Sequence, residues 1–95
     1  MIEVSVQKDE ISIMGHAGYA PRGQDIVCAG VTALTQTLAA SLDNLTDDKP
    51  DYTIAPGVFK LETKALSAKA RLLVDSFFIG ICRIADAYPK NVRMI

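Results

Sequence analysis

The N-terminal part of the sequence alternates between apolar and polar side chains. Residues 2–7 follow this period of two, the polar residues 8–10 interrupt it, and residues 11–13 resume it. Such alternation predicts a β-hairpin with one buried face. Gly15 is expected to end the second strand, and residues 15–24 are expected to form a loop because small residues and a proline follow there without any period.

A helical pattern follows this loop. Asp25 stands directly before it, and Asp is a favoured N-cap because its carboxylate accepts hydrogen bonds from the free N–H groups of a first turn. Residues 47–50, which include a proline, are expected to end the helix. Its expected buried stripe consists of apolar residues at spacings of three and four, namely Val27, Val31, Leu34, Leu38, Leu42 and Leu45.

A second hairpin is expected after this helix. Residues 52–55 and 58–63 would form its strands, and Pro56-Gly57 lies between them. Proline at the second turn position and glycine at the third are typical of a type II turn, since the third position has a positive φ. The sequence therefore predicts a second antiparallel pair of strands.

The last third of the chain carries a second helical pattern. It begins at Ser67, ends before Pro89 and is followed by residues 92–95, which are expected to add a short strand. Its expected buried stripe is Ala70, Leu73, Val74, Phe77, Phe78, Ile81, Ile84, Ala85 and Tyr88. This order of elements predicts an α+β fold, a two-layer sandwich with two helices packed on one face of a mostly antiparallel sheet.

Length and charge limit the classes of function. The 95 residues, 49% of them apolar, are expected to form one domain over residues 1–95. Lys and Arg number 10 against 11 Asp and Glu, and the net charge of −1 does not favour a nucleic acid as direct partner. No charged and then apolar leader opens the sequence, and its apolar stretches look shorter than the ~20 residues of a membrane span. We therefore expect neither export nor a membrane protein.

One His and one Cys carry the candidate chemistry. His16 stands where the second strand gives way to the loop, and it is the only histidine in the sequence. Histidine is the side chain most often used as a general base near neutral pH. Cys28 lies three residues beyond Asp25, where free N–H groups and the helix dipole favour a thiolate over a thiol. Because the loop returns from a strand end to a helix start, the two side chains can meet as a dyad at one edge of the sheet.

Other polar groups are weighed beside this pair. The carboxylate of Asp25 opposes a thiolate at Cys28 unless it points at the helix N–H groups or at His16. Cys82 lies in the middle of the second helix and is expected to be buried and inert, and two cysteines so far apart favour a reducing cytoplasm over a disulfide. One His and two separated Cys are too few for a zinc site, and the loop glycines lack the Lys-Ser/Thr pair of a phosphate-binding loop. Neither a metal nor another cofactor is expected.

Three segments stand out when they are taken together: Gly15-His16-Ala17, Gly23, and Asp25-Ile26-Val27-Cys28-Ala29-Gly30. They closely resemble the motif of the ribosomal-processing cysteine proteases, small bacterial proteins also known as the YsxB-like family. The order of two hairpins and two helices extends the resemblance over nearly the whole chain. It implies a cytoplasmic, homodimeric cysteine endopeptidase that removes a short N-terminal extension from large-subunit ribosomal protein twenty-seven. By this resemblance Cys28 is the nucleophile, His16 the base and Asp25 a supporting residue.

The loop between the dyad residues is expected to meet the substrate and to move as a lid. Tyr19 and Arg22 either contact a peptide or are merely solvated. Main-chain N–H groups at the helix start, including that of Cys28, are expected to stabilise the oxyanion of the reaction. The candidate residues of this substrate loop are Gly18, Tyr19, Arg22 and Gly23.

Three alternatives remain open at this stage. Family members often carry another glycine and an acidic residue where this chain has Ala20 and Pro21, so a paralogous or phage-borne protease with another substrate is one of them. A second is a non-catalytic dimeric module associated with ribosome assembly, in which Cys28 is merely packed. A thiol-redox role is the third and the weakest, because nothing places Cys82 beside Cys28. A packed cysteine resists alkylation, whereas a dyad thiolate reacts fast.

Overall fold

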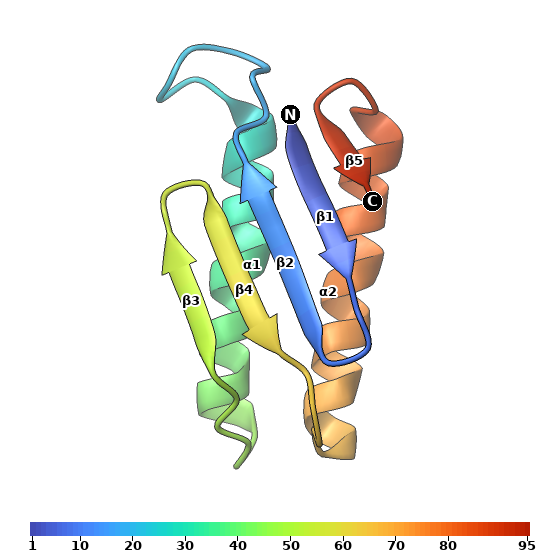
Figure 1. The fold of residues 1–95 in the computed structure, drawn as a ribbon. Helices are drawn as coiled ribbons and strands as arrows, with labels where there is room; N and C mark the ends of the chain where they lie inside the picture. The colour runs from blue at the N-terminus through green and yellow to red at the C-terminus, as the bar shows by residue number, and fades with distance from the viewer.

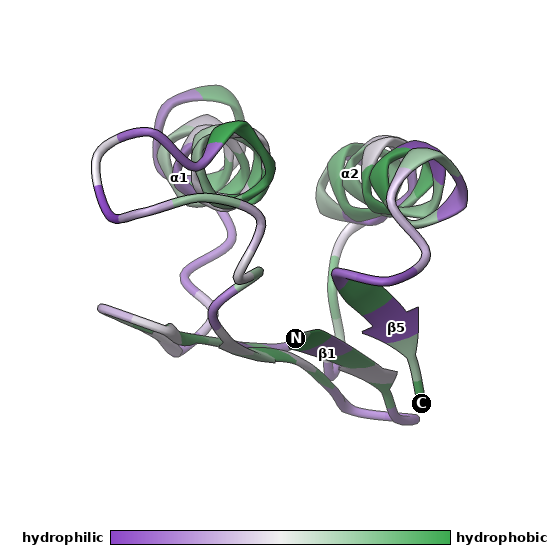
Figure 2. Ribbon diagram, turned by 90° about the horizontal axis from the view of Figure 1, so that it is seen from above, coloured by the Kyte–Doolittle hydropathy of each residue, from purple (hydrophilic) through white to green (hydrophobic).

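The computed structural model describes residues 1–95 as two layers, a five-stranded sheet and two helices (Figure 1). Both helices cover the same face of the sheet, as the view along the strands shows (Figure 2). The predicted α+β two-layer sandwich is therefore confirmed. In chain order the elements are β1 (Ile2–Val6), β2 (Glu10–Gly15), α1 (Ile26–Leu45), β3 (Tyr52–Ala55), β4 (Val58–Glu62), α2 (Ala68–Ala87) and β5 (Val92–Met94).

The strands lie in the order β3-β4-β2-β1-β5. All neighbours are antiparallel except β1 and β5, which are parallel because α2 connects β4 to the far edge of the sheet. Val4 lies opposite Ile13, which in turn lies opposite Phe59, so a row of buried apolar side chains crosses three strands. The short final strand expected from residues 92–95 is present as β5.

The carboxylate of Asp25 begins α1 as predicted, since it accepts hydrogen bonds from the N–H groups of Val27 and Cys28. The predicted stripe is wrong at its end, because Leu45 is 61% exposed. Leu45 is the last residue of α1, and it lies beyond the part of the helix that packs against the core. The buried residues of the helix are Val27, Val31, Thr35, Leu38, Ala39 and Leu42.

The length of α1 corrects a further expectation. The helix has 20 residues and is long and apolar enough to cross a membrane, so the expectation that no apolar stretch reaches this length is wrong. Its buried side chains belong to the core cluster that also includes residues of β1, β2 and β4. Packing against the sheet therefore accounts for the apolar face of the helix.

Ser67 caps α2, with its hydroxyl oxygen accepting a hydrogen bond from the N–H of Ala70 at 3.2 Å. The hydroxyl and the main-chain N–H of Ser67 also donate to the carboxylate of Asp48, which ties the end of the α1–β3 connection to the start of α2. The buried residues of α2 are Ala70, Val74, Phe77 and Ile81, all of them in the predicted stripe.

The predicted Pro56-Gly57 turn joins β3 to β4, and Gly57 has the positive φ of 71° that the third position of a type II turn requires. The carbonyl oxygen of Gly57 accepts a hydrogen bond of 2.8 Å from the N–H of Gly15, the last residue of β2. This bond holds the turn against the end of the strand that leads to His16.

Candidate active site

His16 follows the last residue of β2 and is exposed. Its imidazole lies against the β3–β4 turn, because a Cβ atom added to Gly57 would lie 2.8 Å from Nε2 and 3.2 Å from Cε1. A real Cβ essentially never approaches another atom so closely, so the turn forms one wall beside the ring. The strand end and the turn together fix where the only imidazole of the chain lies.

Cys28 lies in the first turn of α1 and is half-buried. The main-chain N–H of Ala17 donates a hydrogen bond to its Sγ at 3.2 Å. Ala17 directly follows His16 in the chain and is 2% exposed. The segment that carries the imidazole therefore also contacts the sulfur, and this contact brings the strand end and the helix start together.

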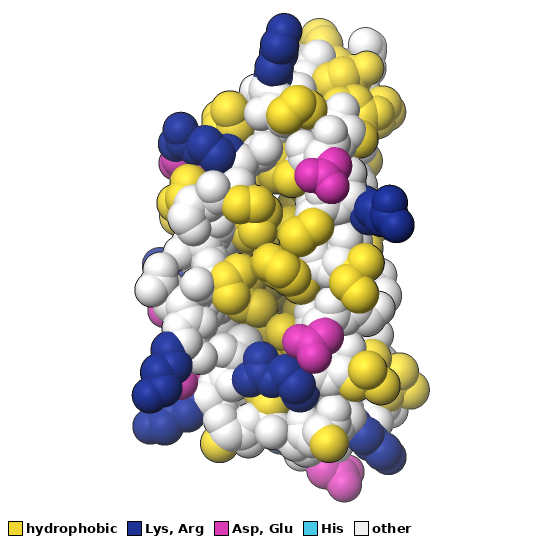
Figure 3. Space-filling view, turned by 90° about the vertical axis from the view of Figure 1, so that its right-hand side faces the viewer, with side chains coloured by type: hydrophobic (Ala, Val, Ile, Leu, Met, Phe, Trp, Pro, Cys, Tyr) yellow, Lys and Arg dark blue, Asp and Glu magenta, His cyan; other side chains and the backbone are white.

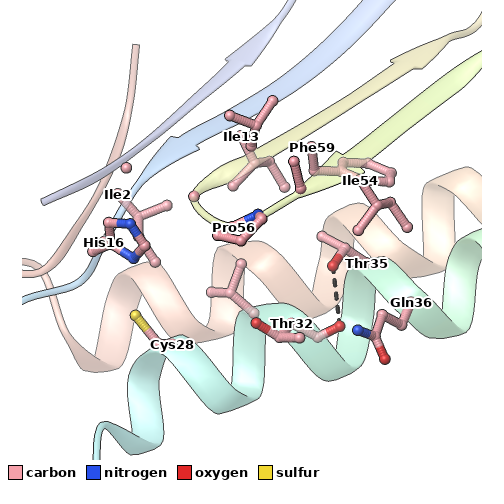
Figure 4. Close-up of a pocket in the computed structure, with 15 residues that line it drawn as sticks. Ile2, Ile13, His16, Cys28, Thr32, Thr35, Gln36, Ile54, Pro56 and Phe59 are labelled. Atoms are coloured by element: carbon pink, nitrogen blue, oxygen red, sulfur yellow. Dashed lines mark hydrogen bonds between the residues drawn. The ribbon is translucent and has the colours of Figure 1, made fainter. Parts of the chain in front are cut away.

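His16 and Cys28 line the same cavity of about 420 Å³, which lies between α1 and the β3–β4 hairpin. Figure 4 shows both side chains at one end of it, with Pro56 and Thr32 next along and Ile54 towards the other end. The structure thus brings the predicted dyad residues together in one site. No hydrogen bond joins the imidazole to the thiol in this state.

A second cavity, of about 920 Å³, opens on the loop side of the same pair. It shares His16 and Cys28 with the first cavity and is also bounded by Pro56. Three of the four candidate loop residues line it, namely Gly18, Arg22 and Gly23. We refer to these two cavities, which meet at His16 and Cys28, together as the groove.

Tyr19, the fourth candidate loop residue, is placed differently from expectation. It does not line either cavity but stacks edge-on against Tyr88 at the end of α2, with ring centroids 5.4 Å apart and an interplanar angle of 84°. Its ring thus holds the loop to the second helix. In this state it is neither simply solvated nor part of the groove.

Asp25 organises the loop as well as the helix. One carboxylate oxygen accepts from the N–H groups of Val27 and Cys28, at 3.0 and 2.9 Å, and the other accepts from those of Tyr19 and Ala20, at 3.0 and 3.4 Å. The N–H of Cys28 is the largest cause that lowers the pKa of Asp25 from its ordinary value, and the other three N–H groups add to it. The carboxylate of Asp25 therefore points at main-chain N–H groups and makes no hydrogen bond to His16.

This arrangement corrects one mechanistic expectation. The N–H of Cys28 was expected to stabilise an oxyanion, but it already donates to Asp25. The N–H of Val27 is engaged by the same carboxylate. In this structure these two N–H groups are therefore not free to bind an oxyanion.

Several site residues were missed by sequence reasoning. Thr32 and Gln36 follow Cys28 by four and eight positions, so helical spacing alone would have placed them on its face. Pro56 and Gly57 were identified only as a turn, because nothing in the sequence shows that this turn lies beside His16. Asn91 was missed as well. It donates a hydrogen bond to the loop from far along the chain, and nothing in the sequence pattern indicates this contact.

Cys82 lies outside both cavities. It is half-buried, so the expectation that it is buried is wrong. Its neighbour Ile81 takes the fully buried position, with 0% exposure, and rotation of about 100° along the helix turns Cys82 partly outward. No group of three or more His, Cys, Asp and Glu side chains is placed to hold a metal ion.

Comparison with known proteins shows the family. The family model of the cysteine protease Prp matches residues 1–93. The chain is similar to the ribosomal processing cysteine protease Prp of Staphylococcus aureus (strain Mu50), at 27% identity over 88 residues, which cover 90% of this chain and 83% of the relative. It is 28% identical over 107 aligned positions to the protein of the same name from Bacillus subtilis (strain 168), covering 99% and 96% of the two chains.

Solved structures share the fold of this chain. The S. aureus protease Prp, in complex with a covalently linked product peptide, has the same fold, with a TM-score of 0.87 at 24% identity and coverage of 98% of this chain and 94% of that one. The structure of SMU.848 from Streptococcus mutans gives a TM-score of 0.78 at 27% identity, covering 98% and 89%. With a family model that spans all but the last two residues, this chain belongs to the cysteine protease Prp family and is a cysteine protease.

Proposed function

We propose that this protein is an endopeptidase that removes a short N-terminal extension from a large-subunit ribosomal protein, protein twenty-seven, with Cys28 as nucleophile and His16 as base. The observation that carries the proposal is the shared groove, which both side chains line. The relatives from S. aureus and B. subtilis are named as ribosomal processing proteases. The S. aureus protease has also been solved with a substrate peptide and with a covalently linked product peptide. Both features support a peptide substrate for this chain.

The reaction begins with transfer of the Cys28 thiol proton to His16. The sulfur then attacks the scissile carbonyl carbon, a C–S bond forms, and the carbonyl π electrons move to oxygen. The C–N bond breaks as the oxyanion collapses, the departing amine takes the proton from His16, and a thioester remains on Cys28. Water then gives a proton to His16 and attacks the thioester, which releases the acid and returns the proton to the thiol.

The groove suits an extended peptide. On one side of the sulfur it is largely apolar, since eight of its 15 lining residues are hydrophobic. A peptide that runs along α1 past Thr32 would place a side chain among Ile13, Ile54 and Phe59. We therefore expect an apolar residue near the scissile bond to contribute to specificity.

On the other side of the sulfur the substrate meets the loop of residues 17–24. Gly18 and Arg22 face the larger cavity there. We propose that the part of this loop beyond Ala17 acts as a lid, which has to move when a peptide passes through the groove. Its attachment through Tyr19 to Tyr88 is the contact that such a movement would break.

The substrate experiment uses the ribosomal protein with and without its N-terminal extension. Incubation of the extended form with this protein, followed by intact-mass analysis, is expected to show loss of the extension for the parent and for Cys82→Ala. Cys28→Ala, with an unchanged far-UV circular dichroism spectrum, is expected to show none. If the parent cleaves other peptides but not this substrate, the chain is a protease with a different target, the alternative raised by Ala20 and Pro21.

We also propose that the protein is a cytoplasmic homodimer. The face over α2 and the β1–β5 edge shows a band of apolar side chains with charged residues around it (Figure 3). Large exposed apolar areas are uncommon on monomers, which favours a second copy here. Multi-angle light scattering at several concentrations measures the mass, and a monomer throughout would contradict the dimer. The exposed apolar residues of these elements are Val6, Leu72, Ile79 and Met94, followed by Ile95.

A further inference from the structure

We propose that the main-chain N–H of Ala17 is the donor that stabilises the oxyanion, and that Asn91 is a positioning residue that holds Ala17 in place for this task. The proposal rests on the proposed function, in which Cys28 attacks a peptide carbonyl. It assigns a role to a residue 74 positions away from Ala17, in the connection between α2 and β5.

At the start of α1 the N–H groups of residues 27–29 are occupied. Those of Val27 and Cys28 donate to the side chain of Asp25, and that of Ala29 donates to its carbonyl oxygen at 3.0 Å. The N–H that points at the nucleophile is instead that of Ala17, 3.2 Å from Sγ. A protease of this kind needs such a donor, because negative charge develops on the carbonyl oxygen during attack.

During the attack, negative charge moves to the oxygen of the scissile carbonyl. When the C–S bond forms, the electron pair of the sulfur becomes the new bond and the carbonyl π pair becomes the charge on oxygen. That oxygen is separated from the sulfur by one atom, the carbonyl carbon, so it reaches the N–H of Ala17 when it lies on the side of the sulfur that faces this N–H. An N–H group binds an oxyanion more strongly than it binds sulfur, which is a weak acceptor. The interaction therefore strengthens as the reaction proceeds, as catalysis requires.

Asn91 holds Ala17 in place. The side-chain Nδ2 of Asn91 donates a hydrogen bond of 3.0 Å to the carbonyl oxygen of Ala17. Asn91 is itself fixed by its main chain, because its N–H donates to the carbonyl oxygen of Tyr88 and its carbonyl oxygen accepts from the N–H of Ile2, at 2.9 and 2.8 Å. Ala17 is 2% exposed, so little room is left for the segment to shift while Asn91 is in place.

A second contact joins the loop to the region where α2 ends, because the ring of Tyr88 packs edge-on against that of Tyr19. The two contacts act on different parts of the loop. The aromatic pair acts on the lid, beyond Ala17, whereas Asn91 acts on the residue whose N–H contacts the sulfur. Loss of the Asn91 amide should accordingly affect the chemical step more than substrate binding.

The first test replaces Asn91 by Ala and, separately, by Asp, which keeps the shape but loses the NH₂ donor. Lys90→Ala is the matched control, because Lys90 is exposed and makes no side-chain hydrogen bond. We expect both Asn91 variants to lower kcat for peptide cleavage by about 10- to 100-fold, the effect of a misplaced catalytic group, with KM changed by less than about 3-fold. Parent-like kcat in both variants, or a loss confined to KM, would overturn the role of Asn91.

A second readout separates positioning from general damage to the site. Alkylation of Cys28 by iodoacetamide passes through no oxyanion, so the Asn91 variants should lose much less in alkylation rate than in kcat. Equal losses in the two rates would mean that Asn91 merely supports the cysteine, and the proposal would fail. The variant Cys28→Ala distinguishes this outcome from failure of the proposed function. If Cys28→Ala still cleaves peptides, Cys28 is not the nucleophile, and the proposed function itself is wrong.

A third variant tests the N–H directly and leaves every side chain in place. In a chemically assembled chain, lactic acid at position 17 replaces the amide of Ala17 by an ester. This change removes the N–H donor and also weakens the carbonyl oxygen of His16 as acceptor for the N-terminal ammonium. We expect kcat to fall by about 10²- to 10³-fold, as found for loss of one oxyanion donor. An ester chain that folds like the parent and keeps its kcat would show that Ala17 does not supply the donor.

Discussion

A methyl group on Gly57 would lie 2.8 Å from Nε2 of His16, so the β3–β4 turn and the imidazole are in direct contact. The carbonyl oxygen of Gly57 also binds the N–H of Gly15, next to His16 in the chain. The turn is thus attached to the histidine twice, once through the main chain of its neighbour and once through the ring. This relationship makes Gly57 a positioning residue for the proposed base.

Replacement of Gly57 tests this contact. Gly57→Ala is expected to lower stability by about 1–2 kcal/mol, because φ is 71° there, and to displace the ring. Gly57→Asn carries the same Cβ but tolerates the left-handed region better, so it should melt closer to the parent. For the Asn variant we expect kcat to fall by about 100-fold. If stopped-flow or steady-state assays give parent kcat for a folded Gly57→Asn protein, the turn does not position His16.

Asp25 is expected to support both the helix start and the loop. Asp25→Ala removes four hydrogen-bond acceptor contacts and should lower the melting temperature by about 4 to 8 °C, the shift typical of a lost helix cap in a domain of this size. Activity should remain low at temperatures at which the variant is fully folded, since the loop that places Ala17 is disturbed. Full recovery of activity there would leave Asp25 with a purely structural role. An unchanged melting temperature would contradict the cap.

Acid should destabilise the protein through Asp25 and Asp48. The main-chain N–H of Cys28 lowers the pKa of Asp25, and the hydroxyl of Ser67 lowers that of Asp48. A carboxyl with a pKa lower in the folded than in the unfolded chain adds stability above its unfolded pKa of about 3.9, and this stability is lost as pH falls through the folded-state pKa.

The measurement for this prediction is the melting temperature as the pH is lowered from about 6 to below the unfolded pKa of about 3.9. Asp25→Asn and Asp48→Asn should each reduce the fall seen in the parent. Asp47→Asn is the control, because Asp47 is exposed and makes no side-chain hydrogen bond. If the melting temperatures of the two variants fall with pH as much as that of the parent, these carboxylates do not cause the acid sensitivity.

The Tyr19–Tyr88 contact is expected to hold the loop closed. Tyr19→Ala should cost about 0.5–1.5 kcal/mol through loss of the edge-on pair and should speed hydrogen exchange of the amides of residues 18–20. Tyr19→Phe keeps the ring and should exchange like the parent. Exchange rates that do not differ between the two variants would mean that the pair does not hold the loop.

The elements of the fold could be predicted because each has a local cause. The cap at Asp25, the turn at Pro56-Gly57 and the cap at Ser67 depend on residue types at fixed positions, and all three are found. The errors are equally local in origin. Leu45 was assigned to the buried face by its spacing, and Cys82 was expected to be buried because it lies in the middle of the second helix. Burial also depends on where a helix passes the edge of the core.

The site could be predicted only in part, since its contacts join distant segments. His16 and Cys28 were found because strand end, loop and helix start are consecutive in the sequence. Neither the contact of Gly57 with His16 nor that of Asn91 with Ala17 has a local signal, because each depends on how the sheet and helices pack. The occupied N–H of Cys28 was missed for a related reason. The spacing identifies Asp25 as a cap, but it does not show which N–H groups remain free.

The most direct test of the account is the alkylation rate of the two cysteines in the native protein at about pH 6.5, where an ordinary thiol is about 1% ionised. Peptide mapping after timed exposure to iodoacetamide gives the rate for Cys28 and for Cys82 separately, in the parent and in His16→Ala. The account predicts that Cys28 reacts much faster than the half-buried Cys82, and that His16→Ala slows Cys28 without affecting Cys82. Equal rates for the two cysteines, or a Cys28 rate indifferent to His16, would contradict an activated Cys28–His16 pair.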